Sequence, residues 1–280
     1  MNFKDALFEA SKILKGNFVK SSILDSEILL SKVIQKDRKY VNLNLDENLN
    51  EKSYNEFKKL IIKRSLGKPI AYLIGKKDFW KFEFSVSEKV LIPRPDTELI
   101  IEEVLKMSKE KSKLKVLDIG VGSGCILLSI LKEKKDFYGV GVDISKKCIE
   151  LSKLNAQNLD VTNRVKFFKS DIDNFFYGKY DLIISNPPYI KKLDLKYLER
   201  DIIKYEPKLA LDGGLDGVSE IRKVVNRSSE LIKKNGQLIL EIAFDQKNKV
   251  KKILMDKGFY INKILKDFGK NNRCIISTKI

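Results

Sequence analysis

The sequence lacks histidine entirely and contains three cysteines and one tryptophan among its 280 residues. Without histidine there is no His-based catalytic triad, no imidazole general base and no His-ligated metal. Cys125, Cys148 and Cys274 lie far apart and form no CxxC pair, which excludes a full disulfide framework and a standard zinc site. We therefore expect a cytoplasmic protein that works in a reducing compartment and holds no metal.

Long apolar runs are also missing. No stretch approaches the roughly 18 residues that a membrane span requires. The first residues, Met1 to Asp5, lack the basic start and apolar centre of a signal peptide. We expect no membrane partner.

Arginine is scarce although the chain is strongly basic. The formal net charge is +17, but only eight of the 55 basic residues are arginine. Arginine is the preferred residue for bidentate recognition of bases and phosphates. The lysine surplus is spread along the chain, which favours a solubilising surface. A weak attraction to RNA, the ribosome or another acidic partner is the alternative.

Three parts are predicted along the chain. Apolar residues at helical spacing predict helices through residues 1–66. Gly67-Lys68-Pro69 breaks that pattern, and the runs 79–86 and 90–92 predict a β-hairpin within 76–92. We expect a helical domain at 1–66, a linker with a hairpin at 67–95, and a third domain at 96–280. The first part is either a substrate-recognition module or a packing cap over the hairpin.

Strands and helices alternate in the third part. This alternation predicts an α/β fold with a doubly wound, seven-stranded sheet whose last two strands pair antiparallel. The expected strands are 114–119, 139–143, 165–170, 180–185, 237–243, 259–265 and 273–279, and the expected helices start near 96 and cover 124–135, 145–158, 217–235 and 246–257.

The most informative motif is Asn186-Pro187-Pro188-Tyr189, which follows the apolar run 180–185. Two prolines cannot continue a strand, so the chain is expected to form a rigid turn there. Ligands bind at the carboxyl ends of strands in open α/β sheets. The Asn186 side chain and the Pro187 carbonyl offer acceptors suited to a planar –NH2 group. The alternative is an ordinary proline-rich turn.

A glycine-rich loop, Asp118-Ile119-Gly120-Val121-Gly122-Ser123-Gly124, follows the strand 114–119. Its spacing differs from G-x-G-x-x-G, and no Lys-Ser or Lys-Thr follows Gly124, so it is not a P-loop. Asp143 ends the next strand, where a carboxylate can accept ribose hydroxyls. Asp171 ends the third strand and is suited to an adenine amino group, with Ile172 packing on the ring. Each acid alone is otherwise an ordinary exposed carboxylate at a strand end.

Together these residues resemble the S-adenosylmethionine site of Rossmann-like methyltransferases. By that resemblance, Asp118 lies near the amino-acid end of the cofactor. The resemblance implies that S-adenosyl-L-methionine is bound by Asp118, Gly120, Val121, Gly122, Ser123, Gly124, Asp143, Asp171, Ile172 and Asn186.

Further segments extend the resemblance over almost the whole chain. The sequence is similar to the protein-(glutamine-N5) methyltransferase family, and within it to the members that modify peptide chain release factors. The segments that carry this similarity are Gly67–Tyr72, Phe79-Trp80, Pro93–Glu98, Glu206–Leu211, Gly213–Gly217 and Leu240–Ile242. Two departures are Ala243, where relatives commonly have glycine, and the lysine-rich run 190–200.

The resemblance implies a function and its residues. The enzyme would transfer a methyl group to the side-chain amide of the glutamine in the Gly-Gly-Gln motif of release factors. Asn186, Pro187 and Tyr189 would be catalytic, and Asn186, Pro187, Pro188 and Tyr189 would bind the substrate, with Tyr189 stacking on its flat amide. Arg94 would either shape the cofactor pocket or bind the substrate loop. Glutamine methylation of a ribosomal protein, N6-adenine methylation of nucleic acid, and a non-catalytic binding module are the alternatives.

Overall fold

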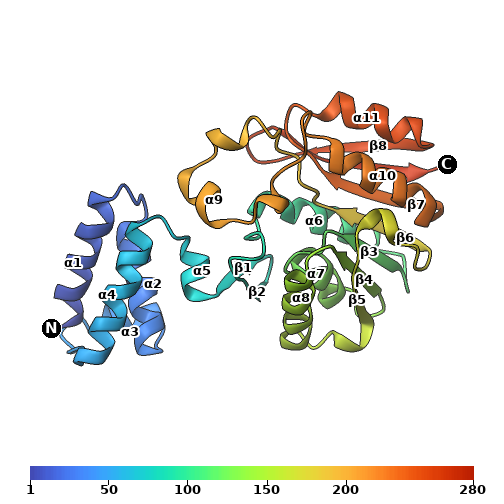
Figure 1. Cartoon of the computed structure of the whole chain (residues 1–280). Helices are drawn as coiled ribbons and strands as arrows, with labels where there is room; N and C mark the ends of the chain where they lie inside the picture. The colour runs from blue at the N-terminus through green and yellow to red at the C-terminus, as the bar shows by residue number, and fades with distance from the viewer. The chain divides into compact units, whose positions relative to one another are not determined.

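The computed structural model describes all 280 residues, and the chain divides into two compact units (Figure 1). One unit comprises Met1–Lys76 together with Glu199–Tyr205, and the other comprises Lys77–Leu198 together with Glu206–Ile280. The three-part division with boundaries at residues 66 and 95 stays a prediction.

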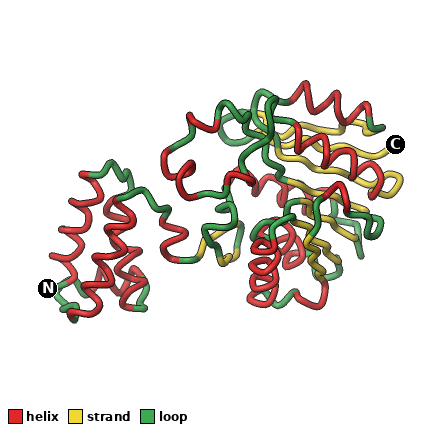
Figure 2. Tube along the Cα trace, in the orientation of Figure 1, coloured by secondary structure: helices red, strands yellow, loops and turns green.

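The first unit is helical, as expected (Figure 2). Three of its helices begin at an Asn or Asp whose side chain accepts from the backbone three residues on, an arrangement that satisfies free N–H groups. Ser21 precedes the second helix but makes no side-chain capping bond. The helices are α1 (Phe3–Gly16), α2 (Ser22–Ile34), α3 (Arg38–Leu43), α4 (Glu51–Ser65), α5 (Ile70–Ile74) and α9 (Arg200–Tyr205).

A partly buried ion pair supports the core of this unit. Arg64 Nε lies 2.7 Å from Asp25 Oδ2, and both side chains are largely buried. Arg64 also donates to the Lys68 carbonyl, which follows the end of α4. The surrounding core contains Phe3, Leu14 and Phe57, from α1 and α4. Because a buried charge is costly without a partner, Asp25 and Arg64 are expected to be needed together.

The second unit is built on the predicted seven-stranded sheet. The strand order is β5-β4-β3-β6-β7-β9-β8, and β9 alone runs opposite to the other six strands. The fold class predicted from the sequence is therefore confirmed. The strands are β3 (Lys115–Ile119), β4 (Tyr138–Asp143), β5 (Val165–Lys169), β6 (Tyr180–Ser185), β7 (Ile232–Glu241), β8 (Phe259–Lys266) and β9 (Asn272–Lys279).

Helices cover both faces of the sheet (Figure 1). Side chains alternate between the faces along each strand, so Val116 joins one apolar core and Leu117 the other. The first core takes residues from α6 (Glu98–Met107), α7 (Cys125–Glu133) and α8 (Lys146–Asn158), and the second from α10 (Ser219–Leu231) and α11 (Lys247–Asp256).

The hairpin differs from its prediction. Its strands are β1 (Lys76–Phe79) and β2 (Phe82–Ser85), joined by a turn in which Trp80 has a φ of 57°. The run 90–92 is not a strand, although Val90 and Ile92 are buried. The predicted helix 217–235 also ends earlier, because β7 already begins at Ile232.

Register brings the ends of the central strands to one edge. Ile119 pairs with Val142 and with Ser185, and Ser185 pairs with Leu240. The chain turns from β3 toward β4 on one side and returns to β6 on the other, so the β3–β6 boundary is the topological switch point of the sheet.

Candidate active site

A cavity of about 480 Å³ opens at this edge of the sheet. It brings together most of the residues that the sequence predicts for a site. The predicted residues that line it are Gly120, Val121, Gly122, Ser123, Asp143, Asp171, Ile172, Asn186, Pro187 and Pro188. Asp118, Gly124 and Tyr189 are not among its lining residues.

The glycine loop has the backbone conformation that its sequence implies. Gly120 has a φ of +77°, and a Cβ built there would meet no protein atom within 4 Å. Gly124 has a φ of +83° at the start of α7, and a Cβ there would lie 2.7 Å from Leu128 Cδ1. The loop therefore approaches the cavity closely at one glycine and packs tightly on its helix at the other.

Asp143 connects this loop to the next strand. Its Oδ2 accepts from Gly122 N at 3.0 Å and its Oδ1 from Ser145 N at 2.8 Å. Burial raises the pKa of this carboxyl, while the two backbone N–H groups act in the opposite direction. Each oxygen accepts one of these bonds and keeps capacity for another, so the side chain can receive hydroxyl groups from the cavity.

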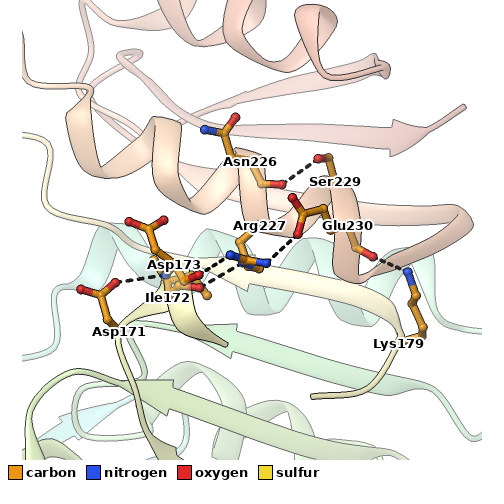
Figure 3. A network of polar contacts seen from close by, with 8 residues as sticks. All are labelled: Asp171, Ile172, Asp173, Lys179, Asn226, Arg227, Ser229 and Glu230. Atoms are coloured by element: carbon orange, nitrogen blue, oxygen red, sulfur yellow. Dashed lines mark hydrogen bonds and ion pairs between the residues drawn. The ribbon is translucent and has the colours of Figure 1, made fainter. Parts of the chain in front are cut away.

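Asp171 and Ile172 lie in a loop held by a residue that the sequence analysis missed. Asp171 precedes the short helix η3 (Ile172–Asn174), and its Oδ1 accepts from Asp173 N at 3.1 Å. Arg227 reaches from α10 to the Ile172 carbonyl, with Nε at 3.2 Å, and to the Asp173 carbonyl (Figure 3).

Arg227 is itself held in place from its own helix. Its Nη1 lies 2.6 Å from Glu230 Oε2, and its guanidinium stacks over the Phe176 ring at 4.1 Å (Figure 3 shows the ion pair). Nine-tenths of this arginine side chain is buried. It therefore fixes the position of η3 rather than contributing to a solvated helix face.

The Asn186 turn lines the cavity and contains two acceptors that have no protein donor. Asn186 Nδ2 donates to Thr97 Oγ1 at 3.2 Å, which leaves its Oδ1 without a protein partner. The neighbouring Pro187 is buried, and its carbonyl accepts no hydrogen bond from the protein. Buried backbone carbonyls are normally paired, so this one is suited to a donor supplied by a ligand.

Tyr189 does not line the cavity. Its hydroxyl donates to Glu241 Oε1 at 3.2 Å, and its carbonyl accepts from Gln246 Nε2 at 2.9 Å. The same Gln246 nitrogen donates to the Gly217 carbonyl at 2.8 Å. Direct stacking of Tyr189 on a substrate amide would require the ring to move, and that contact stays a prediction.

Two buried carboxyl groups lie behind the site. Asp118 is 1% exposed, neither of its oxygens has a hydrogen-bond partner, and burial raises its pKa to about 8. Glu241 is also 1% exposed, and burial raises its pKa to about 7. Asp118 is thus buried and is not among the residues that line the cavity, and its predicted role at the cofactor stays a prediction.

The remaining polar groups at the cavity have structural partners or low reactivity. Arg94 lines the cavity and forms an ion pair with buried Glu206, within one of the family-like segments. Cys125 and Cys148 also line it, but burial raises the pKa of each thiol to about 12, so neither is a ready nucleophile.

No group of three or more Cys, Asp or Glu side chains is arranged to hold a metal ion. No helix is both long and apolar enough to cross a bilayer.

The comparisons with known proteins agree with this architecture. Residues 5–75 match the PrmC N-terminal domain, and residues 95–263 match the methyltransferase small domain. The release factor glutamine methyltransferase of Clostridium acetobutylicum is 37% identical over all of this chain and 99% of its own length. The protein of the same name from Fusobacterium nucleatum is 35% identical over 98% of this chain and 78% of its own length.

A solved structure supports the fold. A methyltransferase from Pyrococcus furiosus superposes with a TM-score of 0.54 over 79% of this chain and 97% of its own, at 17% identity. Taken with the two sequence relatives, the result is plain: this chain belongs to the release factor glutamine methyltransferase family.

Proposed function

We propose, since the chain belongs to this family, that it transfers a methyl group from S-adenosylmethionine to the side-chain amide nitrogen of a release-factor glutamine, the one in the Gly-Gly-Gln motif. One observation carries the proposal beyond the family name. Asn186 Oδ1 and the Pro187 carbonyl belong to consecutive residues that line the cavity, and neither accepts a hydrogen bond from the protein. A primary carboxamide has two N–H donors on one planar nitrogen, which this pair of acceptors can receive.

The cavity residues fit the cofactor. The space in front of Gly120 is open to a ligand atom, and the Asp143 carboxyl keeps acceptor capacity for ribose hydroxyls. Asp171 Oδ2 has no protein partner and is suited to the amino group of adenine, with Ile172 beside it as an apolar surface. When bound, S-adenosylmethionine supplies a methyl group on a positively charged sulfur, which is a strong electrophile with a neutral leaving group.

The chain's own residues address the weakness of the nucleophile. An amide nitrogen is a poor nucleophile because its lone pair is delocalised into the carbonyl. Asn186 Oδ1 and the Pro187 carbonyl would hold both N–H groups and so fix where the remaining lobe of the nitrogen points. Orientation of this kind lowers a barrier by several kcal/mol.

The same two acceptors would also stabilise the transition state electrostatically. As the nitrogen forms its new bond to carbon it gains positive charge, and its N–H groups become stronger donors. Fixed dipoles that point at a developing charge stabilise the transition state without reorganising. The nitrogen then loses one proton to solvent, which completes the substitution.

A labelling assay tests the proposal. The chain is incubated with methyl-tritiated S-adenosylmethionine and purified release factor, and the modified residue is located by mass spectrometry. We expect one methyl group on the side-chain nitrogen of the motif glutamine and none after that glutamine is replaced by alanine. Ribosomal protein and DNA are offered in parallel, and label on either of these instead of the release factor would contradict the proposal.

A further inference from the structure

We infer that Gln246 is a positioning residue whose side-chain amide fixes the Asn186–Tyr189 turn, and with it the two acceptors that receive the substrate carboxamide. This role rests on the proposed function and specifies what holds those acceptors in place. Gln246 is 2% exposed and does not line the cavity, so it acts through the turn and not on the reacting atoms.

The amide of Gln246 joins three segments of the chain. Its Nε2 donates to the Tyr189 carbonyl at 2.9 Å and to the Gly217 carbonyl at 2.8 Å. Its Oε1 accepts from Ala243 N at 3.0 Å. One buried side chain thus holds the turn, the segment 211–217 and the loop between β7 and α11.

These three partners allow only one orientation of the amide. A carbonyl oxygen can only accept a hydrogen bond, and a backbone N–H can only donate one. The nitrogen of the Gln246 amide must therefore face the two carbonyls, and its oxygen must face Ala243 N. Both N–H groups and the oxygen have partners in this orientation, and a reversed amide would lose all three hydrogen bonds.

The backbone of Gln246 is anchored as firmly as its side chain. Gln246 N donates to the Ala243 carbonyl at 3.0 Å, and the Gln246 carbonyl accepts from Val250 N at 3.0 Å. Val250 belongs to α11 and is part of the second apolar core of the sheet. The amide is therefore a fixed support for the turn.

The turn passes a constraint at Tyr189 back to Asn186. The two residues between them are Pro187 and Pro188, whose φ angles are fixed, and each proline also restricts the residue before it. Asn186 is held at its own end by Thr97. The Pro187 carbonyl thus lies between two held ends, and a shift of Tyr189 would move or rotate it.

The segment 211–217 lies directly against the turn. Ile190 N donates to the Leu211 carbonyl at 3.1 Å, and Gly213 N donates to the Ile190 carbonyl at 2.8 Å. A Cβ built on Gly213 would lie 2.8 Å from Tyr189 Cα, so no side chain separates the two backbones. These bonds hold Ile190, whereas the Tyr189 carbonyl accepts from Gln246.

The decisive variant is Gln246→Glu, which keeps the shape of the side chain and replaces the –NH2 group with an oxygen. An ionised carboxylate would place an acceptor opposite the Tyr189 and Gly217 carbonyls and leave both without a donor. We expect kcat on saturating release factor to fall on the order of tenfold or more, because a misplacement of about 1 Å at an orienting group costs up to roughly 10²-fold. The Kd for S-adenosylmethionine is expected to stay within about twofold, because Gln246 does not line the cavity.

Acid is expected to rescue Gln246→Glu. Burial and the two facing carbonyls favour the neutral form of the introduced carboxyl and so raise its pKa. Once protonated, this carboxyl again has one N–H-like donor, its O–H, for a carbonyl of the turn or of the segment 211–217. The ratio of its kcat to that of the unaltered chain should therefore rise as pH falls from about 9 to about 6.

The ratio is needed because native groups titrate in the same range. Burial raises the pKa of Glu241 to about 7, and this group ionises in the variant and in the unaltered chain alike. The titratable and charged groups on the segments around Gln246 are Tyr189, Lys191, Asp212, Asp216, Arg222, Glu241 and Asp245.

Gln246→Met provides a second variant without a charge. It keeps a similar volume and removes all three hydrogen bonds, so we expect a similar loss of kcat whose ratio to the unaltered chain does not change with pH. Gln157→Glu, at an exposed position of α8, is the matched control for the added charge. If Gln246→Glu does not fold by circular dichroism, Gln246→Met decides the question.

A role in stability alone predicts a different result. The melting temperature would then fall in both variants, while kcat per folded molecule and its pH dependence would match those of the unaltered chain. Thermal unfolding and single-turnover assays on the same samples separate the two roles.

The outcomes also distinguish two failures. If the unaltered chain methylates release factor but Gln246→Glu and Gln246→Met keep kcat within about twofold of it, the positioning role is overturned and the proposed function stands. If the unaltered chain binds S-adenosylmethionine and labels no release factor, both are overturned.

Discussion

At the scale of single residues, Asn186 is the side chain on which the proposed chemistry depends most directly. We expect Asn186→Ala to lower kcat on release factor by roughly 10²-fold, the effect of deleting one donor or acceptor from a preorganised transition-state site. Single-turnover assays at saturating S-adenosylmethionine measure this loss. The matched control is Asn226→Ala, at an exposed asparagine of α10. Near-normal turnover in Asn186→Ala would remove the two-acceptor arrangement from the mechanism.

Asp143 should affect binding rather than turnover. Asp143→Ala removes the carboxyl that accepts from Gly122 N and that we propose as the acceptor for the ribose hydroxyls. We expect the Kd for S-adenosylmethionine to rise by tenfold or more, because a bound polar group loses a charged partner. Isothermal calorimetry measures the change, with Asp256→Ala at an exposed position of α11 as the control. An unaltered Kd would exclude Asp143 from the cofactor site.

Sequence reasoning found the cavity residues that lie in an unusual local sequence. Asn186 and Pro187 were predictable because two prolines after an apolar strand permit few conformations. Thr97, Glu241 and Gln246 were not, although Thr97 and Glu241 lie in segments with family similarity. Their contacts join distant parts of the chain: the pairs Tyr189–Glu241, Tyr189–Gln246 and Asn186–Thr97 span 52, 57 and 89 residues, and no local pattern encodes such a pairing.

At the scale of elements, the position of η3 depends on α10. Arg227, on α10, donates to the Ile172 and Asp173 carbonyls of η3. Contact with both carbonyls requires the several N–H donors of a planar guanidinium. We expect Arg227→Lys to weaken S-adenosylmethionine binding by about threefold to tenfold, because a lysine cannot reproduce both carbonyl contacts. Fluorescence or calorimetric titration measures this Kd.

The control for Arg227 is Arg222, which lies earlier on the same helix, α10. Arg222→Lys changes an exposed arginine that pairs with exposed Asp216, so its Kd should stay at the wild-type value. Equal Kd values for Arg227→Lys and the unaltered chain would show that η3 holds its place without this tether. Arg227 escaped prediction because a charged residue in the middle of a helix usually belongs to a solvated face.

The errors in element prediction also have a physical cause. The run 90–92 has strand-like apolar residues, but Leu91 lines the cavity and the segment does not form a strand. The predicted strand 79–86 is interrupted because Trp80 adopts a positive φ, which is uncommon for a bulky residue. The apolar residues at these positions suggested strands, whereas strand pairing depends on segments that are distant in the sequence.

At the scale of the whole molecule, the doubly wound architecture was predictable from connectivity rules more than from residue propensities. Alternating strands and helices with right-handed crossovers leave few arrangements, and the observed sheet is one of them. The burial of Asp118 illustrates what these rules miss. Asp118 lies at a strand end beside the loop, as predicted, but its side chain is buried on the face of the sheet that α7 covers.

Two buried acids should make the stability of the chain depend on pH. The pKa of Asp118 rises from an ordinary value of 3.8 to about 8, and that of Glu241 from 4.5 to about 7. Between these values the folded chain keeps protons that the unfolded chain has lost. The stability that these two groups contribute to the free energy of unfolding is therefore fully present below about pH 4. It is lost as pH rises toward 8, and the free energy of unfolding falls by at most about 1.4 kcal/mol per pH unit for each group.

The substitution Asp118→Asn isolates one of the two groups, because the amide has nearly the same shape and does not ionise. We expect the variant to gain stability relative to the unaltered chain at pH 8, and the gain to shrink at pH 5, where the buried Asp118 is already neutral. Urea unfolding followed by tryptophan fluorescence at both pH values measures the difference. Asp256→Asn, at an exposed aspartate, serves as the control for the charge change alone. A gain that is the same at pH 5 and pH 8 would mean that Asp118 is ionised in the folded protein across this range, and that a partner for its charge exists within the site.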